Sequence, residues 1–143
     1  MGARSRSVEI AAVLRHRAIV IWMLIMLAET GHGAIREIFI APVIGDLPAR
    51  QLGVFVGCGI VFAITWLTVR WMGASTRRAQ WQVGVGWVLL TLGFEIILGR
   101  FLGLSWARIL SDYNLARGGL MIFGLAFMLA APRFAWALRE ESR

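Results

Sequence analysis

Two glutamates interrupt long apolar stretches of this sequence. Glu29 follows the uncharged run Ala18–Ala28, and Glu95 lies inside the stretch 81–102, where Arg100 is the only other charged residue. An ionised carboxylate in an apolar medium is costly, so each glutamate must keep its proton or find a cation. The two residues therefore predict either a site that handles protons or ions, or a hydrogen-bonded contact between helices.

Other ionisable residues follow Glu29 at helical spacing. Glu29, His32 and Arg36 occupy positions i, i+3 and i+7, which form one stripe on a helix, and Glu37 is adjacent to them. Histidine changes charge near neutral pH, so His32 is a candidate proton relay between the acid and the base.

Glu95 needs a partner from another helix. Arg100 is five positions farther along, about 140° around a helix at ~100° per residue, so it is badly placed to serve Glu95. Arg36 is the candidate partner. The predicted polar cluster comprises Glu29, His32, Arg36, Glu37, Glu95 and Arg100.

The composition is that of a membrane protein. Hydrophobic residues make up 59% of the 143 residues and charged residues 16%, whereas soluble domains average about 45–50% and about 25%. The net charge of +7 comes from arginines that punctuate apolar runs, which argues against a nucleic-acid surface. We therefore expect an all-α integral membrane four-helix bundle.

Four spans are predicted, at about 18–36, 50–70, 80–102 and 115–138. Residues 1–17 are expected to form a basic amphipathic segment on the membrane surface, and residues 139–143 a polar tail. Pro42 and Gly45 are expected to end the first helix, with Asp46 as the N-cap of the second span and Asp112 as the cap of the fourth. Gly53 and Gly57 form a GxxxG pattern typical of close helix packing.

Arginine counting predicts the orientation. With four spans, ten arginines fall on the side of the termini and five on the other, so both termini are expected in the cytoplasm and the protein in the inner (plasma) membrane. The pairs Glu29/Asp46 and Glu95/Asp112 are both 17 residues apart, which suggests two tandem two-helix repeats with short interfacial segments on the outer face.

The sequence leaves two functional classes open. It has no P-loop, no GxSxG motif and no Cys/His cluster, so we expect no enzyme, cofactor or metal site. One hypothesis is a non-catalytic accessory or assembly subunit of a membrane complex. The other is a small homo-oligomeric transporter or channel that handles protons or ions through the polar cluster. The expected partners are the lipid bilayer and either further copies or other membrane subunits.

Overall fold

The computed structural model describes the backbone of residues 2–141 and the side chains of residues 8–141, all of them in helices or short connections. The predicted all-α fold is confirmed. The helices are α1 (Gly2–Ile35), the π-helical turn η1 (Arg36–Ile40), α2 (Ala41–Ile44), α3 (Asp46–Met72), α4 (Arg77–Phe101), α5 (Trp106–Ser111), the 3-10 turn η2 (Leu115–Arg117) and α6 (Met121–Glu141).

Four helices are long and apolar enough to cross a membrane. They are Val8–Ile44, Asp46–Met72, Arg77–Phe101 and Met121–Glu141, with mean hydropathy between 1.6 and 2.2. The second and third predicted spans fall on α3 and α4. The fourth helix begins at Met121 rather than at residue 115, because residues 115–117 form η2 and Gly118 takes a left-handed conformation with φ 81°.

The first helix is longer than predicted. It continues through η1 and α2 to Ile44, so the predicted break at Pro42 was wrong. A proline inside a regular helix clashes with the carbonyl four residues before it, but it is tolerated in a first turn. The π-helical turn places Pro42 at the start of α2, with the Ala41 N–H bonded to the Arg36 carbonyl. The break occurs at Gly45, whose φ of 93° favours glycine.

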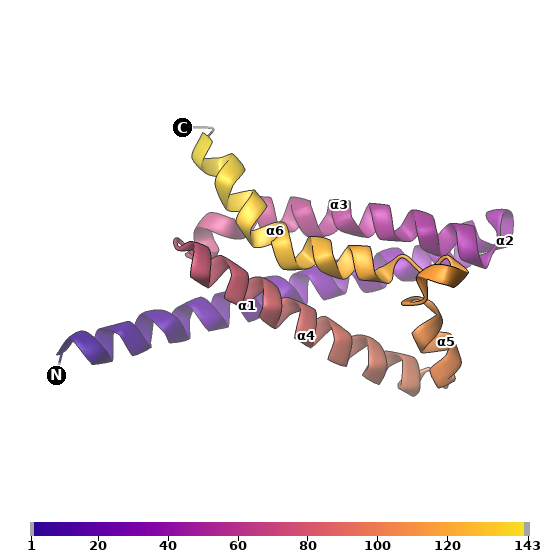
Figure 1. Ribbon diagram of the computed structural model, residues 1–143, viewed down its shortest axis with the longest axis horizontal. Helices are drawn as coiled ribbons and strands as arrows, with labels where there is room; N and C mark the ends of the chain where they lie inside the picture. Colours follow the sequence, from indigo (N-terminus) through magenta and orange to yellow (C-terminus); the bar gives the residue numbers. More distant parts are fainter. Residues whose placement is uncertain (1, 142–143) are drawn as a thin grey trace.

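The N-terminal segment does not form a separate helix. Residues 2–17 belong to the same helix as the first span, so α1 has 34 residues and projects beyond the other helices (Figure 1). Residues 1, 142 and 143 of the predicted N-terminal segment and tail lie outside the described residues.

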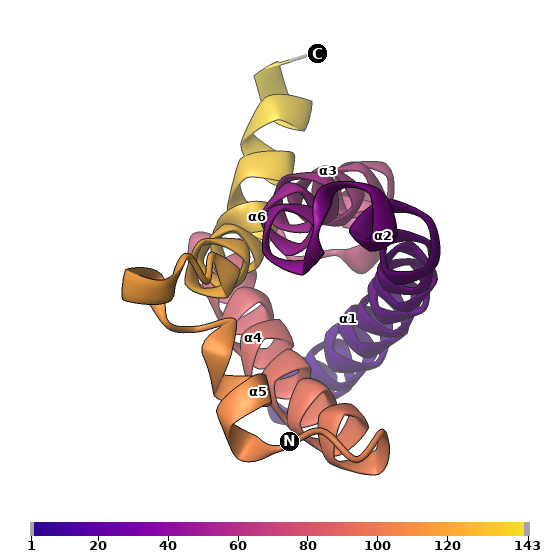
Figure 2. The same cartoon turned by 90° about the vertical axis from the view of Figure 1, so that its right-hand side faces the viewer.

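The long helices alternate in direction, and both termini lie at one end of the bundle, which we call the terminal end (Figure 1). The opposite end carries the Gly45 turn and α5. We call it the cavity end, because the cavity described in the next subsection lies beside it. α3 packs against α1 and α6, and α6 packs against α3 and α4. α1 and α4 meet closer to the terminal end and diverge toward the opposite end (Figures 1 and 2).

The buried core fills the terminal half of the bundle. Trp87 of α4 is fully buried and its indole N–H donates to the Ala18 carbonyl of α1 at 2.8 Å. One turn farther along, Trp22 donates to Thr91 at 3.0 Å. Gly84 lets α6 come close, since a Cβ there would lie 2.0 Å from the Leu129 carbonyl oxygen. These contacts hold α1, α4 and α6 against one another on the side of the cavity that faces the terminal end.

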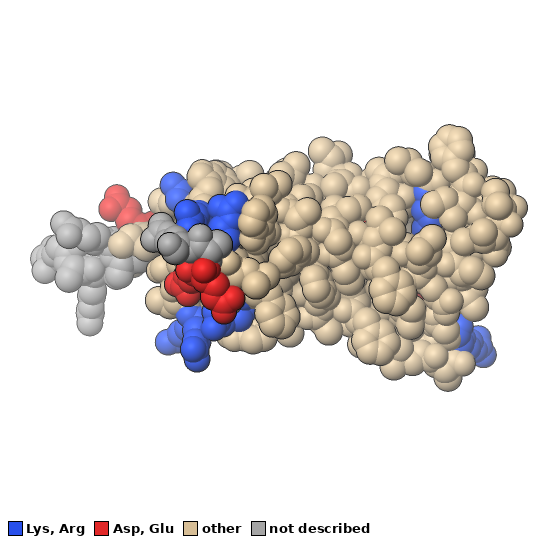
Figure 3. Space-filling model, turned by 90° about the horizontal axis from the view of Figure 1, so that it is seen from above, with Lys and Arg blue, Asp and Glu red and all other residues tan. Residues whose placement is uncertain are grey.

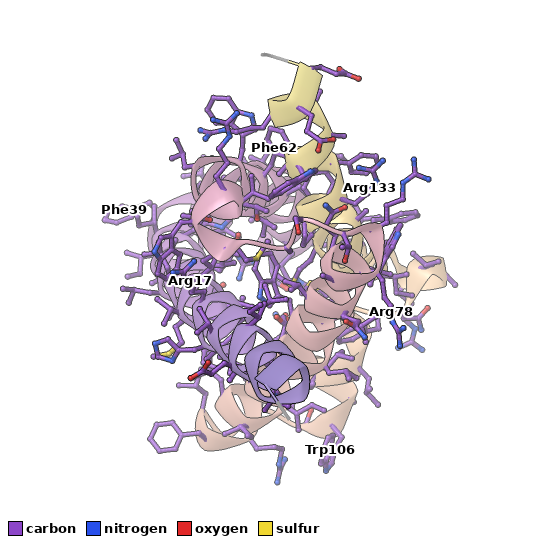
Figure 4. All side chains as sticks on the ribbon, turned by 90° about the vertical axis from the view of Figure 1, so that its left-hand side faces the viewer. Arg17, Phe39, Phe62, Arg78, Trp106 and Arg133 are labelled. Atoms are coloured by element: carbon purple, nitrogen blue, oxygen red, sulfur yellow. The ribbon has the colours of Figure 1, made fainter. Side chains whose placement is uncertain are left out.

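Charged side chains gather toward the terminal end. On the face shown in Figure 3, a belt without charged side chains separates them from the few at the cavity end. The labelled Arg17, Arg78 and Arg133 of Figure 4 come from α1, α4 and α6. Arg17 donates to the Trp71 carbonyl at 2.8 Å and lies over the Trp71 ring. Such arginine and tryptophan contacts are typical of a membrane interface.

Candidate functional site: a polar cavity between the helices

A cavity of about 380 Å³ lies between the four long helices in the half of the bundle next to the cavity end. Figure 2 looks onto this end and shows α1, α3, α4 and α6 arranged around the centre. The walls are largely apolar, but nine residues give them ionisable groups, namely Glu29, His32, Arg36, Arg50, Cys58, Glu95, Arg108, Asp112 and Tyr113. The two glutamates of α1 and α4 therefore face the same space.

The stripe on α1 forms one wall of the cavity. The His32 Nδ1 atom lies 3.5 Å from the Glu29 carboxylate, and the Arg36 guanidinium lies 3.5 Å from the carboxylate of Glu37. Glu37 is mostly exposed, with 61% of its side chain accessible, and stands outside the cavity. Within the described chain, Glu29 Oε1 and Arg36 Nη1 are buried atoms without a hydrogen-bond partner.

Two glycines of α3 make room for this stripe. A Cβ at Gly57 would lie 3.0 Å from Glu29 Oε2 and 3.2 Å from Oε1. A Cβ at Gly53 would lie 2.9 Å from Arg36 Cδ. The GxxxG pattern therefore allows the close helix packing expected from the sequence, and it brings α3 against polar side chains of α1.

Glu95 is held by Tyr113, a residue that the sequence analysis missed. The Tyr113 hydroxyl donates to Glu95 Oε2, and both residues line the cavity. Burial raises the pKa of Tyr113 above its usual range, and the hydrogen bond and the negative charges of Glu95 and Asp112 add to this effect. The phenol therefore stays protonated and remains a donor. A lone tyrosine in the connection after the third span was the available signal.

Besides Glu37, two more predicted members of the cluster lie elsewhere or have other partners. Arg100 is exposed; its guanidinium donates to the Leu104 carbonyl at 2.9 Å and lies over the Trp106 ring, so it does not join the glutamates. The sequence suggested Arg36 as the partner of Glu95, but Arg36 pairs with Glu37 instead. Glu95 and Glu29 nevertheless line the same cavity.

The two predicted aspartate caps are wrong. Gly45 is the N-cap residue of α3, and Asp46 is the first residue of the helix, without a side-chain cap. Asp112 ends α5 and reaches the fourth span only through its backbone, whose carbonyl accepts from the Met121 N–H at 3.1 Å. The spacing from an aspartate to an apolar run did not reveal the helix and turn that lie between Asp112 and α6.

Both aspartates instead belong to a ring of ion pairs at the cavity end. We call the part of the cavity lined by Arg50, Arg108 and Asp112 of this ring its mouth. Arg50 lies 3.0 Å from Asp46 and also contacts Asp112. Arg108 lies 3.3 Å from Asp112 and 3.6 Å from Asp46. This ring joins the start of α3 to α5. It contains two positive and two negative side chains, so it contributes no net charge to the cavity.

The charges that remain on the cavity wall are negative. The ring is neutral and Arg36 is paired with Glu37. In the described residues, no arginine lies within ion-pairing distance of Glu29 or Glu95, whose side-chain partners are His32 and Tyr113. A cavity with two carboxylates of this kind can take up positive charge, either as protons or as a bound cation.

No protein-family model, curated protein sequence or solved structure matches this chain. The four apolar helices fit a multi-pass membrane protein. Its function is therefore inferred from the cavity and the residues that line it.

Proposed function

We propose that the protein is a small membrane transporter for monovalent cations, protons included, and that Glu29 and Glu95 bind the cation inside the cavity. The observation that carries this proposal is that both carboxylates line one cavity and have no arginine partner. Ionisable groups within membrane spans are expensive and commonly mark ion pathways.

The neighbours of the two carboxylates suit this role. His32 is next to Glu29 and can exchange a proton with it near neutral pH. Tyr113 donates a hydrogen bond to Glu95 and orients its carboxylate. Cation binding and proton binding at the same carboxylates exclude each other, which couples the two.

The competing hypothesis is an accessory or assembly subunit in which the same residues only hold the helices together. A structural polar network is stabilising when its buried atoms are satisfied. Here Glu29 Oε1 and Arg36 Nη1 have no partner in the described chain, and they lie on a cavity wall. These open positions favour ligand binding over packing.

We further propose that the terminal end faces the cytoplasm across the inner (plasma) membrane, so that the cavity end faces outward. The excess of arginines on the side of the termini supports this orientation. The cavity lies within one chain, and assembly into a homo-oligomer stays a prediction.

The test is proton movement in liposomes that contain the purified protein. A pH gradient is imposed, the external salt is varied from Na⁺ to tetraethylammonium, and a trapped dye reports internal pH. We expect at least one cation to dissipate the gradient through the wild-type protein. Glu29→Gln and Glu95→Gln should each abolish this flux, because glutamine keeps the shape of glutamate but has no titratable group.

The matched control is Glu9→Gln, which removes an exposed carboxylate of α1 far from the cavity and should preserve the flux. Transport is contradicted if no cation dissipates the gradient. The subunit hypothesis predicts instead that the two cavity variants lower the unfolding temperature or lose a stoichiometric partner after mild extraction from native membranes.

A further inference from the structure

The size of the cavity and the residues that line it indicate the chemical class of the cation. We infer, on the basis of the transport function proposed above, that the cation is organic, an ammonium group that carries an apolar substituent. Charge, size and wall chemistry each support this class.

The charge of the cavity selects for a cation over an anion. Arg50 and Arg108 are each shared between Asp46 and Asp112, so the mouth is neutral. Arg36 is paired with Glu37 at 3.5 Å. The carboxylates of Glu29 and Glu95 remain, one on each side of the cavity. An anion placed between them would meet two like charges in a medium of low dielectric constant.

The size of the cavity exceeds that of an inorganic ion. A volume of about 380 Å³ lies in the range of small-molecule sites, which starts at about 300 Å³. A dehydrated alkali ion would leave most of this space empty. An ammonium group with an aryl or branched alkyl substituent would fill it and keep its positive charge at the carboxylates.

The deeper wall is built for an apolar substituent. Toward the buried core it is lined by Met26, Val61, Phe94, Leu125 and Met128. Thr91 is the polar residue at this depth, and its hydroxyl is used by the Trp22 indole and by the Met128 sulfur at 3.3 Å. Aromatic and thioether groups pack well on aryl groups and onto cations.

The carboxylates stand between this apolar wall and the mouth. Glu29 follows Met26 by three residues on α1, and Glu95 follows Phe94 on α4, so both carboxylates lie on the mouth side of the apolar wall. Tyr113 and the ion-pair ring then close the outer side. A bound ligand would therefore point its substituent toward the core and its ammonium group toward the mouth.

The experiment compares four probes by titration calorimetry on the detergent-solubilised wild-type protein, with blanks for micelle partitioning. Phenyltrimethylammonium carries both features. Tetramethylammonium lacks the apolar group, tert-butylbenzene is the neutral isostere, and benzoate carries the opposite charge. We expect phenyltrimethylammonium to bind at least roughly tenfold more tightly than each of the others.

Three results would overturn the class. Equal binding of tert-butylbenzene would show that the apolar wall acts alone, equal binding of tetramethylammonium would show that the substituent is not recognised, and binding of benzoate would reverse the charge preference. Among variants, Glu29→Gln and Glu95→Gln should weaken phenyltrimethylammonium binding roughly tenfold. Glu9→Gln, an exposed position of α1 outside the cavity, should leave it unchanged, and an equal loss in all three variants would also contradict the inference.

The two proposals fail in different ways. Proton flux with an inorganic cation and no binding of phenyltrimethylammonium would leave transport in place and refute the organic class. Selective binding of phenyltrimethylammonium without flux of any cation would support the ligand class and refute transport.

Discussion

At the scale of single residues, the two glutamates of the cavity differ in the group that partners each of them. Glu29 lies beside His32, which can gain or lose a proton near neutral pH, whereas Glu95 accepts from the Tyr113 phenol. The α1 pair is therefore suited to exchange protons, and the α4 pair to hold a carboxylate in one orientation. Glycines of α3 give the first pair its space.

The phenol of Tyr113 should titrate above pH 10. It is the only tyrosine in the chain, so near-ultraviolet absorbance of tyrosinate reports it directly. Because folding raises its pKa, the stability that this adds is complete below pH about 10 and is lost as the pH rises further. Glu95→Gln should move the midpoint back toward 10. A wild-type midpoint at 10 would contradict the buried hydrogen bond.

Gly57→Ala should reduce transport without unfolding the protein. The new methyl group would lie about 3.0–3.4 Å from the Glu29 carboxyl atoms and displace them, while alanine favours the helix by up to ~1 kcal/mol. We expect a several-fold loss of flux in liposomes and an unchanged or higher unfolding temperature. Gly59→Ala is the control, since a Cβ there meets nothing within 4 Å. Equal flux in both variants would show that the space at Gly57 is irrelevant.

The cavity residues of α1 could be predicted from the sequence more fully than the cavity residues of the other elements. Helical spacing alone placed Glu29, His32 and Arg36 on one face, and the structure gives them one cavity wall. It did not find Tyr113, because the connection that returns Tyr113 to α4 has no periodicity. Nor could it assign Arg50, whose two carboxylate partners are far apart in the chain.

At the scale of elements, two features decide where the cavity lies. α4 and α6 approach each other at Gly84, toward the terminal end, where Leu129 leaves no space for a side chain. At the other end, residues of the connection between α4 and α6 line the cavity, and the ion-pair ring joins this connection to α3. Tight packing at one end thus accompanies an open space at the other.

Gly84→Ala should destabilise the bundle. A Cβ at this position would lie 2.0 Å from the Leu129 carbonyl oxygen, so α4 and α6 must separate, at a cost of at least ~1–3 kcal/mol. Gly86→Ala places the same methyl group on the same helix where nothing lies within 4 Å, and should be neutral or stabilising. Thermal unfolding in detergent measures both. Similar unfolding temperatures for the two variants would refute the close approach of α4 and α6.

The ends of the elements were harder to predict than their existence. Long apolar runs require a helix, so the four spans follow from composition and length. The π-helical turn before Pro42 does not, because it depends on hydrogen bonds of the backbone that leave no residue pattern. Tertiary contacts at Asp112 and the Gly118 turn likewise decided that the fourth span begins at Met121.

At the scale of the whole molecule, the chain forms two helical hairpins, α1–α3 and α4–α6, joined mainly through α3 and α6. Corresponding helices run in the same direction (Figure 1), as a tandem repeat requires. The connections differ, since a turn at Gly45 serves the first hairpin and α5 with η2 the second. Each hairpin contributes one glutamate to the shared cavity.

The proposed orientation predicts the location of the two ends of α4. A reporter enzyme that works only in the cytoplasm should be active when it is inserted after Gly73, next to the terminal end. A reporter enzyme that works only outside the cytoplasm should be active when it is inserted after Gly103, beside the cavity. Both glycines lie in turns with positive φ, so the insertions leave the helices intact. The reverse pattern would invert the orientation and turn the cavity inward.

The account depends on a cavity that is open to solutes and carries negative charge. The single native cysteine, Cys58, lines it and provides a probe without any substitution. Its reaction rate with a cationic methanethiosulfonate is compared with that of an anionic one, each normalised to the rate with a free thiol. We expect the cationic reagent to be favoured, and Glu29→Gln to reduce that preference. No reaction before denaturation, or a preference for the anionic reagent, would contradict the account.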